Sequence, residues 1–184
     1  MPELGRAALV ATLGLALYAV VAGGVAARSR RRRLAESARN ALLLTLPTTA
    51  LATGILLLAF ARNDYSFVYV WELTSDDLPL GYTLAALWGG QAGSLLFWLL
   101  LLTLYSAAAV MLNRTASRDL LVWVVPVLAG VMTFFALVLV AVSSPFTTQE
   151  PPADGRGLNP SLQNPYMVAH PVFLYLGYVG LTVP

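Results

Sequence analysis

Long apolar runs separated by polar stretches dominate this chain. Four of the runs are about 20 residues long, enough for one helix to cross the hydrocarbon core of a bilayer. They cover residues 7–27, 41–61, 94–112 and 120–142, and a fifth run, 171–184, is cut off at the end of the chain. The pattern predicts an all-α integral membrane protein with about four complete transmembrane helices and the start of a fifth. A short outer-surface helix and long outer loops complete the expected fold, a single polytopic membrane segment over 1–184.

Composition supports a membrane protein and excludes several functions. Hydrophobic residues make up 58% of the chain and charged residues 11%, whereas a soluble domain carries about 25% charged residues. The net charge of +2 is too small to suggest a nucleic-acid partner. The chain has no cysteine, so it holds no disulfide, no thiolate metal site and no C-x-x-C-H haem attachment motif.

The arginines predict the orientation of the chain in the membrane. Six of them lie between the first two apolar runs, and Arg114 and Arg118 lie between the third and fourth. In a four-span topology both loops share one side, which the positive-inside rule makes cytoplasmic. The N-terminus and the loops 62–93 and 143–170 then face the outside. The arginine run could instead form a lipid- or nucleic-acid-binding patch, but orienting the chain is a sufficient explanation for it.

Aromatic residues alternate in the first outer loop, at Tyr65, Phe67, Tyr69 and Trp71. This spacing predicts an extended segment with the four rings on one face. An aromatic belt at the membrane interface is the interpretation that we favour. The alternative is one wall of a groove for a flat apolar ligand.

The segment 80–94 contains three glycines next to the third apolar run. A continuous helix through both would be about 45 Å long, well beyond a hydrocarbon core of about 30 Å. We therefore expect a break at Gly89, Gly90 and Gly93, after a short outer-surface helix over 81–88. Ser94 is expected to cap the following helix. The glycines allow close approach by another helix or by a ligand, and the spacing does not choose between them.

The only histidine of the chain, His170, follows a proline-rich outer loop and precedes Pro171. Pro171 suits a first helical position. Zinc normally needs three or four protein ligands, whereas haem iron needs one or two axial ligands. Tyr178 falls near the His170 face of a helix and Tyr175 less so. From this chemistry alone, a structural histidine is the favoured interpretation.

Three motifs together change that balance. Residues 88–98, W-G-G-Q-A-G-S-L-L-F-W, resemble the W-G-G-[HQ]-E-G-S-L-L-x-W segment of the CcmF-type cytochrome c biogenesis proteins. The D-G-R-G-L-N-P stretch from Asp154 resembles the same family. So does 170–180, which fits the family's H-P-x-x-x-Y-x-G-Y-V-G. The match runs in order along the whole chain, which therefore resembles the N-terminal portion of a member of the CcmF/CcsA-type cytochrome c assembly family.

The resemblance implies a haem lyase subunit of the inner membrane that acts in cytochrome c maturation. His170 is expected to be an axial haem ligand on the periplasmic face, with Trp88, Tyr175 and Tyr178 as further haem-binding candidates. The implied partners are a haem carrier protein, thiol-reducing maturation subunits, apocytochrome c and the membrane lipid. Haem vinyl groups would be joined to the cysteine thiols of an apocytochrome C-x-x-C-H motif.

Two departures limit what this chain does alone. Ala92 stands where the family usually has a glutamate. The chain also lacks the family's tryptophan-rich motif and its further histidines, so it offers one axial ligand and not a complete lyase. Two alternatives involve no haem: a structural membrane scaffold, and half of a transporter with the glycine turn at the substrate path.

Overall fold

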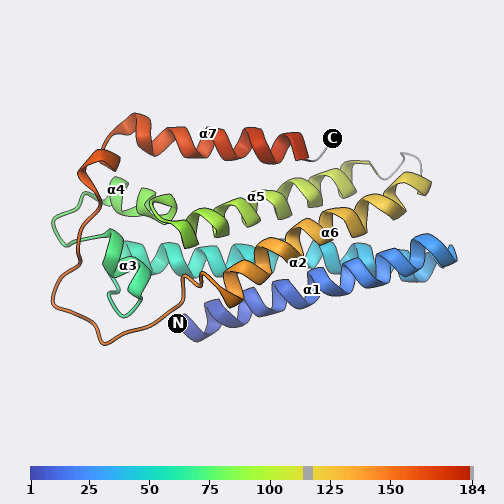
Figure 1. Ribbon diagram of the computed structural model, residues 1–184, viewed down its shortest axis with the longest axis horizontal. Helices are drawn as coiled ribbons and strands as arrows, with labels where there is room; N and C mark the ends of the chain where they lie inside the picture. Colours follow the sequence, from blue (N-terminus) through green and yellow to red (C-terminus); the bar gives the residue numbers. More distant parts are fainter. Residues whose placement is uncertain (114–117, 183–184) are drawn as a thin grey trace.

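The computed structural model describes residues 1–113 and 118–182, and helices dominate both ranges (Figure 1). The long helices are α1 (Pro2–Ser29), α2 (Arg32–Ala61), α5 (Gln91–Leu112), α6 (Arg118–Ala141) and α7 (Pro165–Thr182). Shorter helical segments are α3 (Val68–Leu73), α4 (Leu80–Ala85) and the 3-10 turns η1 (Ala86–Trp88) and η2 (Pro160–Leu162). These two ranges contain no strand, only an isolated antiparallel bridge between Phe67 and Thr148.

Four of the described helices are long and apolar enough to cross a membrane, which confirms the predicted all-α membrane fold. They are α1, α2, α5 and residues Val122–Ala141 of α6. At 1.5 Å per residue the 28 residues of α1 and the 30 of α2 extend about 42 and 45 Å. Both therefore exceed a hydrocarbon core of about 30 Å. α2 starts at Arg32 rather than near residue 41, so its arginine-rich first turns are helical too.

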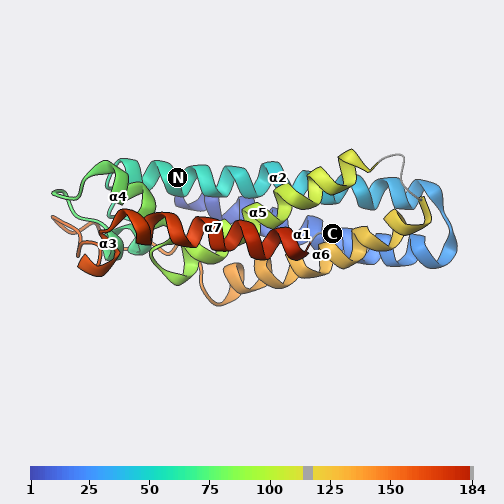
Figure 2. The same cartoon turned by 90° about the horizontal axis from the view of Figure 1, so that it is seen from above.

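The bundle has two different ends. At one, which we call the arginine end, α1 and α2 are joined by a tight connection through Arg30 and Arg31 (Figure 1). At the other, the loop end, lie the N-terminus, residues 62–90, residues 143–164 and the start of α7. α7 packs mainly on α5 and stops part-way along the bundle in both views (Figures 1 and 2).

Small residues bring α1 close to its two neighbours, α2 and α6. Its buried residues are mostly alanine and glycine, and a Cβ added at Gly23 would lie 3.1 Å from the Pro126 ring of α6. A Cβ at Gly5 would overlap the ring of Phe146. Thr12 Oγ1 of α1 lies 2.8 Å from Thr48 Oγ1 of α2. Close backbone approach and hydroxyl pairs replace the hydrophobic driving force that is missing between helices in lipid.

The predicted extended aromatic segment is wrong from Val68 onward. Residues 68–73 form the one-turn helix α3, in which Trp71 N–H donates to the Phe67 carbonyl. Tyr65, Phe67 and Tyr69 are all buried. Period-two spacing failed because the rings pack in different directions into the core of the loop end. They form neither a lipid-facing belt nor a groove wall.

Two predicted helix starts are also wrong, while the predicted break in the third run is present. α4 and η1 are followed by bends at Gly89 and Gly90, and α5 begins at Gln91. Ser94 is therefore inside α5, where its Oγ donates to the Trp88 carbonyl at 2.9 Å rather than capping the helix. α7 begins at Pro165, so Pro171 lies inside it. Pro165 itself occupies the favourable first position.

Candidate functional site

A buried tyrosine fixes the glycine turn that carries Trp88. Tyr69 Oη donates to the Leu87 carbonyl at 3.0 Å and accepts from Gly90 N–H at 3.1 Å. Burial raises the pKa of Tyr69, so its hydroxyl stays protonated and keeps donating. A Cβ at Gly93 would overlap the Leu87 carbonyl oxygen. At Gly93, therefore, the close approach that glycine allows is made by the chain's own backbone and not by a ligand.

Hydrogen bonds of Asp154 attach the loop 143–164 to residues on either side of α3. Asp154 Oδ1 accepts from the N–H groups of Asp76 at 3.0 Å and Gly155 at 2.7 Å. These hydrogen bonds lower the pKa of the Asp154 carboxyl. The Tyr65 hydroxyl lies 2.7 Å from Asp76 Oδ1 and 3.2 Å from Asp154 Oδ1, and burial together with these carboxylates raises its pKa.

The same loop is held further along by Arg156. Its guanidinium lies 4.3 Å from the centre of the Trp71 ring, and the backbone N–H of Arg156 donates to the Trp71 carbonyl at 2.8 Å. A Cβ at Gly155 would overlap the Thr74 carbonyl oxygen. These contacts order the residues that lead into α7.

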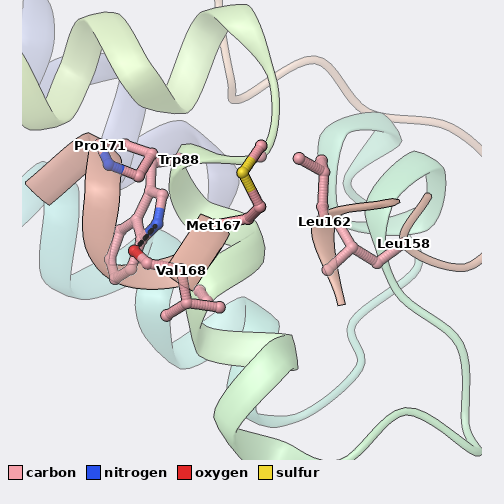
Figure 3. A pocket seen from close by; sticks show the side chains of 8 residues that line it. Trp88, Leu158, Leu162, Met167, Val168 and Pro171 are labelled. Atoms are coloured by element: carbon pink, nitrogen blue, oxygen red, sulfur yellow. Dashed lines mark hydrogen bonds between the residues drawn. The ribbon is translucent and has the colours of Figure 1, made fainter. Parts of the chain in front are cut away.

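Trp88 connects the glycine turn to α7. Its Nε1–H donates to the Val168 carbonyl at 3.1 Å, one turn before Pro171 (Figure 3). A cavity of about 50 Å³ lies beside the indole, lined also by Pro171, Met167 and Leu158. That space suits a water molecule rather than a cofactor. Trp88 therefore supports α7 by packing and hydrogen bonding to its first turns.

Three of the four candidate residues pack on aromatic side chains of α5, and His170 does not. Trp88 and Tyr175 face α5: Trp88 packs on Phe97 at 5.5 Å, and Tyr175 packs on Phe97 and Trp98 at 6.0 and 5.4 Å between ring centroids. His170 is exposed and makes no hydrogen bond to the described residues. Tyr178, two helical turns further along α7, is 55% exposed, and its ring also stacks on Trp98 of α5 with 6.3 Å between centroids.

The His170 face of α7 is apolar and open. Spacings of three and four residues place Phe173, Leu174 and Leu181 on that face with His170, and they are 72%, 40% and 85% exposed. A Cβ at Gly177 would meet no atom within 4 Å. An imidazole thus stands at the loop end of a flat apolar stripe.

Comparison with known proteins places these residues in a family. A sequence profile described as "Cytochrome C assembly protein" matches residues 88–184, the stretch that contains all four candidates. The chain belongs to the cytochrome c assembly protein family. The resemblance predicted from the three motifs is confirmed.

Several curated members of this family match over nearly the whole chain. The cytochrome c-type biogenesis protein CcmF of Escherichia coli (strain K12) is 38% identical over 100% of the chain and 29% of its own length. CycK of Rhizobium meliloti (strain 1021) is 37% identical over 98% of the chain and 27% of its own length. The solved structure of "Cytochrome c Heme Lyase CcmF" superposes with a TM-score of 0.84 at 28% identity, covering 100% of the chain and 29% of that structure. The chain thus spans less than a third of these relatives.

Sequence reasoning missed the residues that place α7. Tyr69 appeared only as one ring in an alternating series, because its partners Leu87 and Gly90 lie far along the chain. Arg156 lies in the D-G-R-G-L-N-P stretch, but nothing in that stretch indicates its contact with Trp71. A buried hydroxyl and a cation–π pair have no local sequence signal, since both depend on contacts between distant segments.

Proposed function

We propose that this chain handles haem as a substrate in cytochrome c maturation, with His170 donating one axial ligand to haem iron. The observation that carries the proposal is the exposed imidazole at the loop end of the apolar α7 face. Neutral imidazole is a standard haem ligand, and its second nitrogen is then available to a hydrogen-bond acceptor. Membership of the cytochrome c assembly family supports the same role.

The surroundings of His170 fit a porphyrin on the outer face of α7. Phe173, Leu174 and Leu181 offer exposed apolar surface in line with the imidazole, whereas the cavity beside Trp88 holds only about 50 Å³. Tyr178 borders that surface, because its half-exposed ring also stacks on Trp98 of α5. Trp88 and Tyr175 position α7 through their contacts with α5. α7 supplies one wall of the proposed site.

The contribution of this chain to the reaction is orientation. Haem supplies the vinyl groups that are joined to the cysteine thiols of an apocytochrome. A histidine on a helix that is fixed by the loop end holds that substrate in one geometry, which is where a bound arrangement gains its rate advantage. A haem carrier, thiol-reducing subunits and apocytochrome c are the proposed partners.

The proposed location is the inner membrane with the loop end facing the periplasm. The arginines at the opposite end of α1 and α2 support this orientation through the positive-inside rule. The N-terminus and His170 would then lie on the periplasmic side, where apocytochromes receive haem.

The test uses the chain purified in mild detergent, with any co-purifying subunits, through an affinity tag that contains no histidine. Because His170 is the only histidine, His170→Gly should abolish most of the Soret absorbance of the preparation. Added imidazole should restore it by occupying the vacated position. The matched control is Ala169→Gly, which introduces the same helix-weakening glycine one residue away and should keep the absorbance.

Equal haem content in His170→Gly and Ala169→Gly would show that His170 is not a ligand. The scaffold interpretation would then gain support. Loss in both variants would show that the integrity of α7, rather than the imidazole, retains haem, and imidazole would not restore it.

A further inference from the structure

A hollow of about 680 Å³ lies at the arginine end, where the α1–α2 connection meets the start of α6. Arg28, Arg30, Arg31 and Arg32 line it from α1, the connection and α2, and Trp123 lines it from α6. The size is within the range of ordinary ligand pockets, about 300–1,000 Å³. No described residue on its lining is acidic.

Backbone geometry gathers the arginines around this space. α1 ends at Ser29 and α2 begins at Arg32, so the chain reverses within two residues. Arg30 adopts the left-handed conformation (φ 52°) and Arg31 is extended. Ala26, Ala27 and Ala35 also line the hollow, so the part of its wall that α1 and α2 supply beside the arginines is made of short apolar side chains.

Charge and shape together select a phosphate-bearing ligand. Guanidinium groups present planar pairs of N–H donors that match phosphate oxygens. Arg32 Nε contacts Glu36 at 3.0 Å, but both side chains are well exposed, so this pair is weak and solvent-screened. Several cations around one concave surface focus their field on a single anion.

The position of the hollow favours a lipid over a soluble anion. Trp123 is 50% exposed and sits next to Val122, where the apolar segment Val122–Ala141 begins. Tryptophan at the end of a membrane segment lies at headgroup level. A phosphate held there has arginines above it and an apolar wall of alanine, valine and indole below it, which matches a phosphodiester joined to acyl chains.

We propose that this hollow binds the phosphate headgroup of an anionic phospholipid. The site is independent of haem and of the loop end. It adds a specific ligand to the general role of the arginines in orienting the chain, because it depends on which arginines line the hollow and not on their number.

The experiment titrates the purified full chain in detergent with phosphatidylglycerol, phosphatidylcholine or inorganic phosphate, and counts bound molecules by native mass spectrometry. We expect phosphatidylglycerol to bind at least about tenfold more tightly than phosphatidylcholine, and inorganic phosphate to bind weakly. The double variant Arg30→Gln/Arg31→Gln should lose about tenfold in affinity for phosphatidylglycerol.

The matched control is Arg33→Gln/Arg39→Gln, which removes the same charge from the same stretch but from outside the lining. It should change affinity by less than about twofold. Ala27→Leu keeps every charge and fills the hollow, so it should also weaken binding. This variant keeps the test decisive if the arginine variants fold poorly.

Three results would overturn the proposal. Equal losses in the two double variants would mean diffuse surface charge rather than a site. Equal binding of the two lipids would remove the headgroup specificity. Inorganic phosphate binding as tightly as phosphatidylglycerol would identify a soluble-anion site instead.

Discussion

The two ends of the bundle are built in opposite ways. The loop end is closed by buried hydroxyls, backbone hydrogen bonds and glycines that have no room for a Cβ. The arginine end is open, with exposed cations around a hollow of about 680 Å³. The loop end uses packing to fix the helix that carries His170, the proposed haem ligand. At the arginine end, the proposed recognition is shared by the particular arginines that line the hollow rather than carried by one side chain.

The largest effect should come from adding one methyl group to the closed end. Gly93→Ala places a Cβ against the Leu87 carbonyl oxygen and close to the Tyr69 hydroxyl, which are held by each other. Overpacking against backbone should destabilise the chain by about 3 kcal/mol. Thermal unfolding in mild detergent, followed by circular dichroism, measures this.

Gly130→Ala is the matched control in α6. A Cβ there would meet nothing within 4 Å, so the substitution should be neutral or stabilise the helix by about 0.5–1 kcal/mol. Similar unfolding temperatures for the two variants would show that the glycine turn is looser than the structure indicates.

Removing one oxygen from the closed end should have the next largest effect. Tyr69→Phe leaves the Leu87 carbonyl and Gly90 N–H without their buried partner. We expect a loss of about 2 kcal/mol in the free energy of unfolding. Tyr82→Phe serves as the control, because the Tyr82 hydroxyl makes no hydrogen bond to the described residues. Equal stability of the two variants would contradict the assigned role of Tyr69.

At the arginine end, by contrast, one substitution is expected to raise the free energy of unfolding by a smaller amount. Arg30 and Asn63 are the described non-glycine residues with positive φ, at 52° and 47°. Arg30→Gly should stabilise the chain by about 0.5 kcal/mol, because arginine is strained in this conformation and glycine is not. Asn63→Gly should change stability by only a few tenths, since asparagine adopts the left-handed conformation more readily.

Backbone hydrogen bonds define the conformation around Asn63. Asn63 N–H donates to the Phe60 carbonyl and Asp64 N–H to the Ala59 carbonyl, which close the end of α2. Chemical denaturation at fixed detergent concentration resolves differences of this size. A larger gain for Asn63→Gly than for Arg30→Gly would reverse the assignment of strain to the open end.

The smallest expected effect is a pH dependence at the closed end. The carboxyl of Asp154 has a pKa below its ordinary value of 3.8, so near that pH the unfolded chain binds more protons than the folded one. The contribution of Asp154 is therefore fully present well above pH 4 and is lost as the pH falls below about 4. Asp154→Asn should remove this part of the acid sensitivity.

Unfolding temperatures measured from pH 7 to pH 3 test the point. Asp77→Asn is the control, since the Asp77 side chain makes no hydrogen bond to the described residues. Parallel pH curves for the wild type and Asp154→Asn would argue against a stabilising role for the Asp154 carboxylate.

The apolar runs were enough to predict the helical bundle, because a segment in lipid must satisfy its own backbone hydrogen bonds and therefore forms a helix. Length predicted the break and the glycines predicted its place, at Gly89 and Gly90, although the third glycine of the prediction, Gly93, lies inside α5. The direction of the Tyr65–Trp71 rings did not, since a single helical turn formed where packing demanded it. His170 was found as the lone histidine, but α7 starts at Pro165, six residues before the predicted start at Pro171, so His170 lies inside the helix.

The sequence by itself determined which segments are long and apolar, which residues can ligate iron, and the family to which they belong. Those properties are local, since hydropathy, side-chain chemistry and motif spacing need no third dimension. Only the tertiary structure decided that Trp88 supports α7, that Tyr69 pins the glycine turn, and that four arginines surround one hollow. Each of these joins residues from separate segments, and their distances are set by how the helices pack.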